Sequence, residues 1–184
     1  MPLLGLHADK KWKKYLKHQL YYLMFRLRRR NFKNAILVFG DPRGGTTWLT
    51  EILHSLPNTA INWEPLHVIN GVVPKSYKFG WWPYLKREEG NKKYKTLFKA
   101  ILTAKLGNAW TRRFCNTDTL LQSKYIITKF VRGSQLLPWF TLQFPELKHK
   151  PIYILRHPIT SCMSQLKAFQ KLDRKAMWKE IHYK

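Results

Sequence analysis

Cysteine and acidic residues are both scarce in this sequence of 184 residues. Its two cysteines, Cys115 and Cys162, lie far apart and form no CxxC pair. This spacing excludes a disulfide-stapled scaffold and a cysteine-rich zinc site, and it indicates a reducing compartment. Only 10 residues are Asp or Glu against 34 Lys or Arg, so the formal net charge is +24. Because a compact domain with this charge repels itself, we expect anions among its partners or substrates.

Long apolar runs are also absent. The longest ones, residues 20–25 and 35–39, fall far short of the roughly 20 residues that a helix needs to cross a bilayer. The first residues lack the charged start, apolar core and small-residue cleavage site of a signal peptide. These absences predict a soluble cytoplasmic protein. Peripheral contact with a membrane surface is still compatible with the sequence.

The positive charge is unevenly distributed along the chain. Residues 1–33 contain ten Lys or Arg and one acid, and residues 75–113 contain eleven Lys or Arg and two acids. Residues 34–74 between them contain one Arg and three acids. Basic segments therefore flank a stretch that keeps a few acids, which suits a site that attracts polyanions and holds a functional carboxylate.

The N-terminal segment, residues 1–33, is predicted to form a basic amphipathic helix over residues 10–30. This stretch lacks Gly and Pro, and its apolar residues recur every three to four positions: Trp12, Leu16, Leu20, Leu23 and Leu27. The other faces carry Lys and Arg, as in helices that lie on a membrane or bind nucleic acid. A surface helix that packs its apolar stripe on the core explains the pattern equally well.

Residues 34–184 are predicted to form one α/β domain with a parallel central sheet flanked by helices, because strand and helix patterns alternate. The apolar run at residues 35–40 is typical of a strand buried on both faces. The expected strands are residues 35–40, 59–63, 124–130 and 151–155, and the expected helices are residues 46–56, 94–106, 134–144 and 159–172. The first of these helices has its apolar residues on one side: Trp48, Leu49, Ile52, Leu53 and Leu56. Residues 65–118 are interpreted as an irregular insertion.

A glycine-rich turn between the first strand and the first helix has the components of a phosphate-binding loop. Gly44 and Gly45 allow a tight turn without side chains that would block a phosphate. The following helix directs free N–H groups toward that space, and Arg43, Thr46 and Thr47 add a charge and hydroxyls. A plain glycine-rich turn is the alternative. The fingerprints GxxxxGK[ST] and GxGxxG are both absent, which argues against the standard nucleotide and dinucleotide sites.

A second candidate anion site follows the last predicted strand. Arg156 ends that strand, at the edge of a parallel sheet where ligands bind, and Ser164 lies eight residues later in the next helix. A guanidinium and a hydroxyl can together hold a phosphate. An ordinary surface ion pair would explain Arg156 as well.

Together the two motifs resemble those of sulfotransferases that use PAPS (3′-phosphoadenosine-5′-phosphosulfate). The 5′-phosphosulfate loop of that family would correspond to Arg43, Gly44, Gly45, Thr46, Thr47 and Trp48, and its 3′-phosphate element to Arg156 and Ser164. The resemblance implies a P-loop NTPase-like α/β fold, PAPS as co-substrate and transfer without a metal. It implies transfer to a hydroxyl or an amine, and we expect the acceptor to be a hydroxyl-bearing carbohydrate contacted by residues 65–118. Relative to the family, Gly44 replaces a Ser, and we expect the C-terminal part of the usual domain to be missing.

Glu64 is the residue that we expect to act as catalytic base, because similar carbohydrate sulfotransferases have Glu-Pro at the end of the second strand. Sulfuryl transfer to an alcohol needs such a base and positive charge near the leaving phosphate. Lys129 and Arg43 are the expected sources of that charge. A plain salt bridge to a cation would also explain Glu64, and a solvated lysine at a strand end would also explain Lys129. His67 and His157 are lesser candidates, interpreted mainly as spectators.

Two other functions compete with this interpretation. A basic module that binds nucleic acid or another polyanion would explain the net charge and the eight Trp residues. However, no nucleic-acid motif is present, so we expect no specific nucleic-acid partner. A nucleotide kinase-like P-loop protein would explain the glycine turn, but the missing Lys before Thr46 counts against it.

Overall fold

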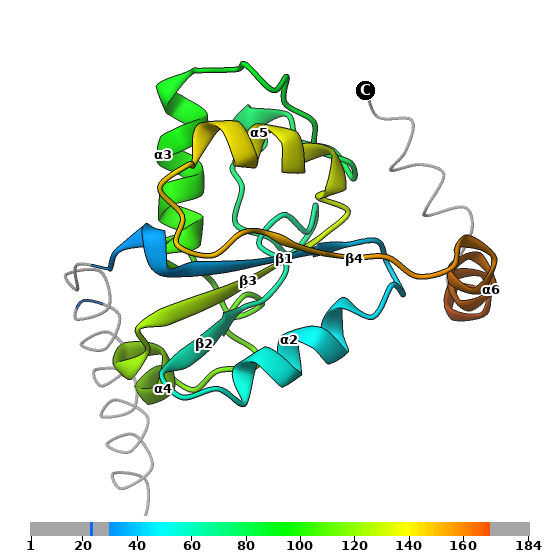
Figure 1. Cartoon of the computed structure of the whole chain (residues 1–184), viewed down its shortest axis with the longest axis horizontal. Helices are drawn as coiled ribbons and strands as arrows, with labels where there is room; N and C mark the ends of the chain where they lie inside the picture. The colour runs from blue at the N-terminus through cyan, green and yellow to red at the C-terminus, as the bar shows by residue number, and fades with distance from the viewer. Residues whose placement is uncertain (1–22, 24–29, 170–184) are drawn as a thin grey trace, which may run out of the picture.

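The computed structural model describes Leu23 and residues 30–169 (Figure 1). Helices and strands alternate along the chain in the order β1 (Ala35–Gly40), α2 (Thr46–His54), β2 (Thr59–Asn62), α3 (Lys92–Leu102), α4 (Thr117–Gln122), β3 (Tyr125–Val131), α5 (Leu137–Gln143), β4 (Ile152–Ile154) and α6 (Pro158–Phe169). Short 3-10 turns occupy Phe32–Asn34, Lys75–Tyr77 and Ser134–Leu136. Most of the predicted N-terminal helix lies outside the described residues.

The four strands form one parallel sheet in the order β2-β3-β1-β4. β1 lies inside the sheet, where Val38 pairs with Lys129 of β3 on one side and with Ile152 of β4 on the other. The chain passes from β1 to β2 and β3 on one side and later to β4 on the opposite side. This reversal creates a crevice at the carboxyl end of β1, the usual ligand position in such sheets. The predicted α/β fold with a parallel sheet is confirmed.

Alternate residues of β1 are buried on opposite faces of the sheet. Leu37 and Phe39 belong to a core with α3 and α5, whereas Ile36 and Val38 pack with Leu49 of α2. Figure 1 shows α3 and α5 on one side of the sheet and α2 on the other. Leu120 of α4 packs with Ala60 and Ile126 near the start of β2 and β3. Because both faces are covered, an apolar residue is favoured at every position of β1, as its sequence predicted.

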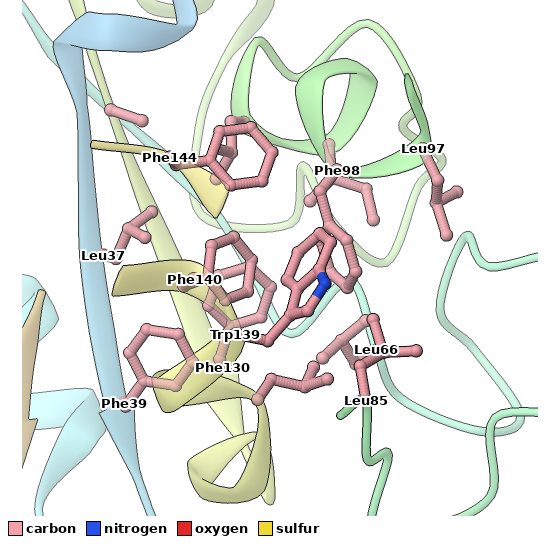
Figure 2. Close-up of a cluster of buried hydrophobic side chains, with 14 residues drawn as sticks. Leu37, Phe39, Leu66, Leu85, Leu97, Phe98, Phe130, Trp139, Phe140 and Phe144 are labelled. Atoms are coloured by element: carbon pink, nitrogen blue, oxygen red, sulfur yellow. The ribbon is translucent and has the colours of Figure 1, made fainter. Parts of the chain in front are cut away.

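The core on the α3 and α5 side is largely aromatic (Figure 2). Phe39 stacks on Phe130 with ring centroids 4.9 Å apart, and Phe140 meets Phe98 edge to face at 4.8 Å. Trp139 is fully buried, and its indole N–H donates to the carbonyl of Glu89 at 2.8 Å. Such rings combine a large buried apolar area with a preferred geometry. They fix α5 over the sheet next to the carboxyl ends of β1 and β3.

Only part of the apolar side of α2 is buried. Leu49 and Leu53 pack on the sheet, but Trp48, Ile52 and Leu56 are exposed. The buried residues of α2 are Thr46 and Thr50, so the side facing the sheet is rotated away from the positions of Trp48 and Ile52. Of the five apolar residues that the sequence places on one side of the helix, only Leu49 and Leu53 therefore contribute to the core. The sequence analysis missed α4, a helix of only six residues.

None of the described helices has the length and apolar character needed to span a membrane.

Candidate active site

A cavity of about 510 Å³ opens where the carboxyl ends of the strands meet the N-terminus of α2. Residues from the glycine turn, from the ends of β2, β3 and β4, and from α2 form its wall: Pro42, Arg43, Gly45, Thr46, Thr47, Trp48, Glu51, Trp63, Glu64, His67, Lys129, Val131, Arg132 and Arg156. Four of these residues are Lys or Arg and two are Glu. The wall is therefore cationic, as a site for a multiply charged anion requires.

The glycine turn forms one wall of this cavity through backbone atoms. Gly45 has φ of 98°, a left-handed conformation that glycine adopts at little cost, and it is the N-cap of α2. No side chain caps the helix, so its first N–H groups remain available to an anion. Gly44 serves the turn itself, since its N–H donates to the carbonyl of Asp41 at 2.9 Å and a Cβ would lie 2.9 Å from that oxygen.

A chain of three polar side chains crosses the cavity from β2 to α2. Lys129 Nζ lies 3.1 Å from Glu64 Oε1 and donates a hydrogen bond to Thr47 Oγ1 at 2.9 Å. The same ammonium lies 3.4 Å from the ring centroid of Trp63. Lys129 is only 2% exposed and Glu64 17%, so the pair is shielded from water. The cation is thus held between the predicted base and the glycine turn.

Burial lowers the pKa of Lys129 below that of an ordinary lysine, because desolvation disfavours the ammonium. The charge of Glu64, its hydrogen bond and the charge of Glu51 oppose this effect, while the charge of Arg113 adds to it. The proton on Lys129 is consequently more easily lost than on a solvated lysine, and Glu64 is its main stabilising partner.

The second predicted anion site lies against the glycine turn. Arg43 Nε donates to Ser164 Oγ at 3.0 Å, and a guanidinium N–H of Arg156 donates to the carbonyl of Arg43 at 3.2 Å. Gln165 of α6 donates to the carbonyl of Pro42 at 3.0 Å. These contacts tie α6 to the turn, although Figure 1 shows α6 beyond the end of the sheet. Arg43 thus points toward Ser164 while lining the cavity, and its role at the leaving phosphate stays a prediction.

Three residues of the cavity wall have strained backbone conformations. Arg43, Glu64 and Arg132 have φ of 64°, 39° and 65°, respectively, which is uncommon for residues other than glycine. Each of them lies just beyond the end of a different strand. Backbone strain of this kind costs about 1–3 kcal/mol per residue and tends to cluster at functional sites.

Most of the predicted site residues line this one cavity. They are Arg43, Gly45, Thr46, Thr47, Trp48, Glu64, Lys129 and Arg156. Gly44 and Ser164 lie directly behind the wall, and of the two histidines only His67 reaches it. Three further residues of the wall were not predicted from the sequence: Arg132, Trp63 and Glu51. Arg132 follows the third strand by one residue, so the rule that strand ends line the site could have identified it.

No group of three or more His, Cys, Asp or Glu side chains is placed to hold a metal ion in the part of the chain that the structure describes.

Comparison with protein families matches residues 35–183 to the family described as Sulfotransferase family. The matched range contains the glycine turn, Glu64, Lys129 and the Arg156–Ser164 pair. Searches of curated proteins and of solved structures gave no significant match.

Proposed function

The chain belongs to the sulfotransferase family, a family of PAPS-dependent transferases, and we propose that it moves the sulfuryl group of PAPS to a carbohydrate hydroxyl with Glu64 as base. The observation that carries this proposal is the Glu64–Lys129–Thr47 chain inside a cationic cavity. It joins a carboxylate, a shielded cation and the phosphate-binding turn within hydrogen-bonding distance of each other.

PAPS fits the residues of the cavity in two places. Gly45 leaves open a cradle of backbone N–H groups at the start of α2, which suits the 5′-phosphosulfate. Arg156 and Ser164, linked through Arg43, offer a guanidinium and a hydroxyl to the 3′-phosphate. When bound, PAPS supplies an activated sulfuryl group and a phosphate as leaving group.

Glu64 can accept the proton of an acceptor hydroxyl because its carboxylate lies at the cavity wall, where Lys129 Nζ is 3.1 Å from Oε1. The ion pair involves Oε1, and no side chain of the described residues makes a hydrogen bond with Oε2. Oε2 therefore remains available for the acceptor proton, while the strained backbone of Glu64 and the contact with Lys129 fix the direction of the carboxylate. Positioned general bases contribute about 10²–10⁴-fold to rate.

The proposed role of Lys129 is to stabilise negative charge that develops on the leaving phosphate beside Thr47. Because burial lowers the pKa of Lys129, we expect turnover to fall in alkaline solution at a pH below the ordinary lysine value of about 10.4. A pH–rate profile measures this alkaline decrease in turnover. Lys129→Met should turn over more slowly and should not show the decrease. An unchanged alkaline decrease in that variant would assign the titration to another group.

Arg156→Ala is expected to weaken binding of the desulfated product PAP by about 10- to 100-fold, because a hydrogen bond to a charged group contributes about 1.5–3 kcal/mol. Ser164→Ala should weaken it less, since only a neutral hydroxyl is lost. Calorimetric titration with PAP measures both effects. Arg87→Ala is the charge-matched control, because Arg87 is exposed and does not line the cavity. Parental PAP affinity in Arg156→Ala would refute the 3′-phosphate assignment.

A carbohydrate acceptor is supported by the aromatic residues on the Glu64 side of the cavity. Trp63 lines the wall, and His67 lies between Trp81 and Trp110 with ring centroids 5.7 and 4.8 Å away. Trp82 and Tyr84 are exposed nearby in sequence and could stack on sugar rings. Most of these residues belong to segment 65–118, the proposed acceptor side. Transfer of labelled sulfate from PAPS to a panel of oligosaccharides and simple phenols tests the assignment, and exclusive use of phenols would refute it.

A further inference from the structure

Arg132 lies in the cavity but has no part in the proposed chemistry so far. It follows β3 directly, and its backbone N–H donates to the carbonyl of Gly40 at 3.2 Å. This bond holds the strained backbone of Arg132 against the end of β1. Its side chain reaches the cavity wall together with Glu64 and Lys129.

The guanidinium of Arg132 stacks on Trp81, with Cζ 4.7 Å from the ring centroid. Within residues 30–169, no side chain or carbonyl forms a hydrogen bond or an ion pair with this guanidinium. Arg43 and Arg156 differ in this respect, since each donates a hydrogen bond to another residue of the site. Stacking on Trp81 occupies one face of the guanidinium and leaves its N–H edge for another group.

Arg132 is only half-exposed, and burial lowers its pKa, an effect that the charge of Glu64 opposes. A partly desolvated guanidinium without a hydrogen-bonded carboxylate is stabilised further when an anion joins it. Arginine recognises carboxylates through two parallel hydrogen bonds, with its planar fork matching their geometry.

The order of the strands indicates which anion this is. Arg156 follows β4, the glycine turn follows β1, Arg132 follows β3 and Glu64 follows β2. Along the edge of the sheet, Arg132 therefore lies between the glycine turn and Glu64, on the side away from Arg156. The phosphates of PAPS have their own ligands at the turn and at Arg156. An anion at Arg132 would thus belong to the acceptor.

From this arrangement, and resting on the proposed function, we propose that Arg132 binds a carboxylate of the acceptor beside its reacting hydroxyl. The substrate class is a hydroxyl-bearing sugar acid. The pairing orients the acceptor because the guanidinium stacks on Trp81 and because Glu64 follows β2, the strand next to β3. An alternative, contact of Arg132 with PAPS, makes a different prediction for PAP binding.

Two probes that differ in one carboxylate test this proposal: p-nitrophenyl β-D-glucuronide and p-nitrophenyl β-D-glucoside. Each is titrated calorimetrically into the full chain, with and without saturating PAP. We expect the glucuronide to bind at least tenfold more tightly than the glucoside. Arg132→Gln should remove this preference, and Arg132→Lys should reduce it, since lysine keeps the charge but lacks the fork. Both variants should bind PAP within about twofold of the parent.

Arg113→Gln is the matched control, because Arg113 also stacks on a tryptophan, with Cζ 4.6 Å from the ring centroid of Trp110, and does not line the cavity. It should keep the glucuronide preference. No preference in the parent, or one that survives in both Arg132 variants, overturns the proposal. A tenfold loss of PAP affinity in Arg132→Gln overturns it as well, by assigning Arg132 to PAPS. Failure of the parent to bind PAP would refute the proposed function, while the titrations without PAP would still test Arg132.

Discussion

Glu64→Gln is expected to reduce turnover by about 10²–10⁴-fold while PAP affinity stays nearly unchanged. The amide keeps the shape of the side chain but cannot accept the acceptor proton. PAP affinity should persist because the proposed phosphate ligands belong to the glycine turn and the Arg156–Ser164 pair. Initial rates with saturating PAPS, together with calorimetric titration of PAP, separate the two effects.

The substitution also removes the carboxylate that pairs with Lys129, a cation that is 2% exposed. Thermal melts must therefore accompany the rates, since a buried charge without its partner destabilises the fold. Glu51→Gln is the matched control, because Glu51 is the second carboxylate of the cavity wall and is exposed. A folded Glu64→Gln variant with near-parental turnover would remove Glu64 from the mechanism and make His67 the next candidate.

Gly45→Val is expected to abolish measurable PAP binding. Gly45 lines the cavity with φ of 98°, so a branched side chain there would be strained and would crowd the anion cradle. Its Cβ would also lie 3.3 Å from Cδ1 of Ile154. We therefore expect a lower melting temperature as well as the loss of PAP-induced stabilisation. Melts with and without PAP, and calorimetry well below the transition, measure both.

Gly90→Val controls for the general cost of adding a branched residue. A Cβ at Gly90 would meet only the carbonyl of Glu88, at 3.8 Å, and Gly90 does not line the cavity. It should melt close to the parent and bind PAP equally well. If PAP raised the melting temperature of Gly45→Val as much as that of the parent, the turn would be structural and the phosphate cradle would lie elsewhere.

Local sequence patterns determined the strands of the sheet and the two anion motifs. The run at residues 35–40 is apolar at every position because both of its faces are covered, and β1 occupies those residues. The glycines before Thr46 indicated a tight turn, and the structure has a left-handed glycine at the N-cap of α2. Such features depend on neighbours a few residues away, so a single sequence reveals them.

Patterns within one element were less informative about its orientation. The apolar residues of α2 lie on one side of the helix, but only part of that side is buried, because Trp48 borders the cavity and Ile52 faces outward. Hydrophobic spacing gives the helix but not its rotation, which depends on how it packs against β1 and β3. The short helix α4 gave no periodic signal, since six residues make fewer than two turns.

By itself, the sequence determined the fold class and the family, and it predicted the residues of the candidate site. Only the tertiary structure decided that Lys129 bridges Glu64 and Thr47, although Lys129 and Thr47 are 82 residues apart in the sequence. It also decided that Arg132 stacks on Trp81 beside the Glu64–Lys129 pair. Both arrangements depend on the strand order β2-β3-β1-β4 and on its register, which bring distant strand ends to one edge. Strand order is a property of the whole packed sheet, because non-local pairing and burial select it, and no local segment encodes it.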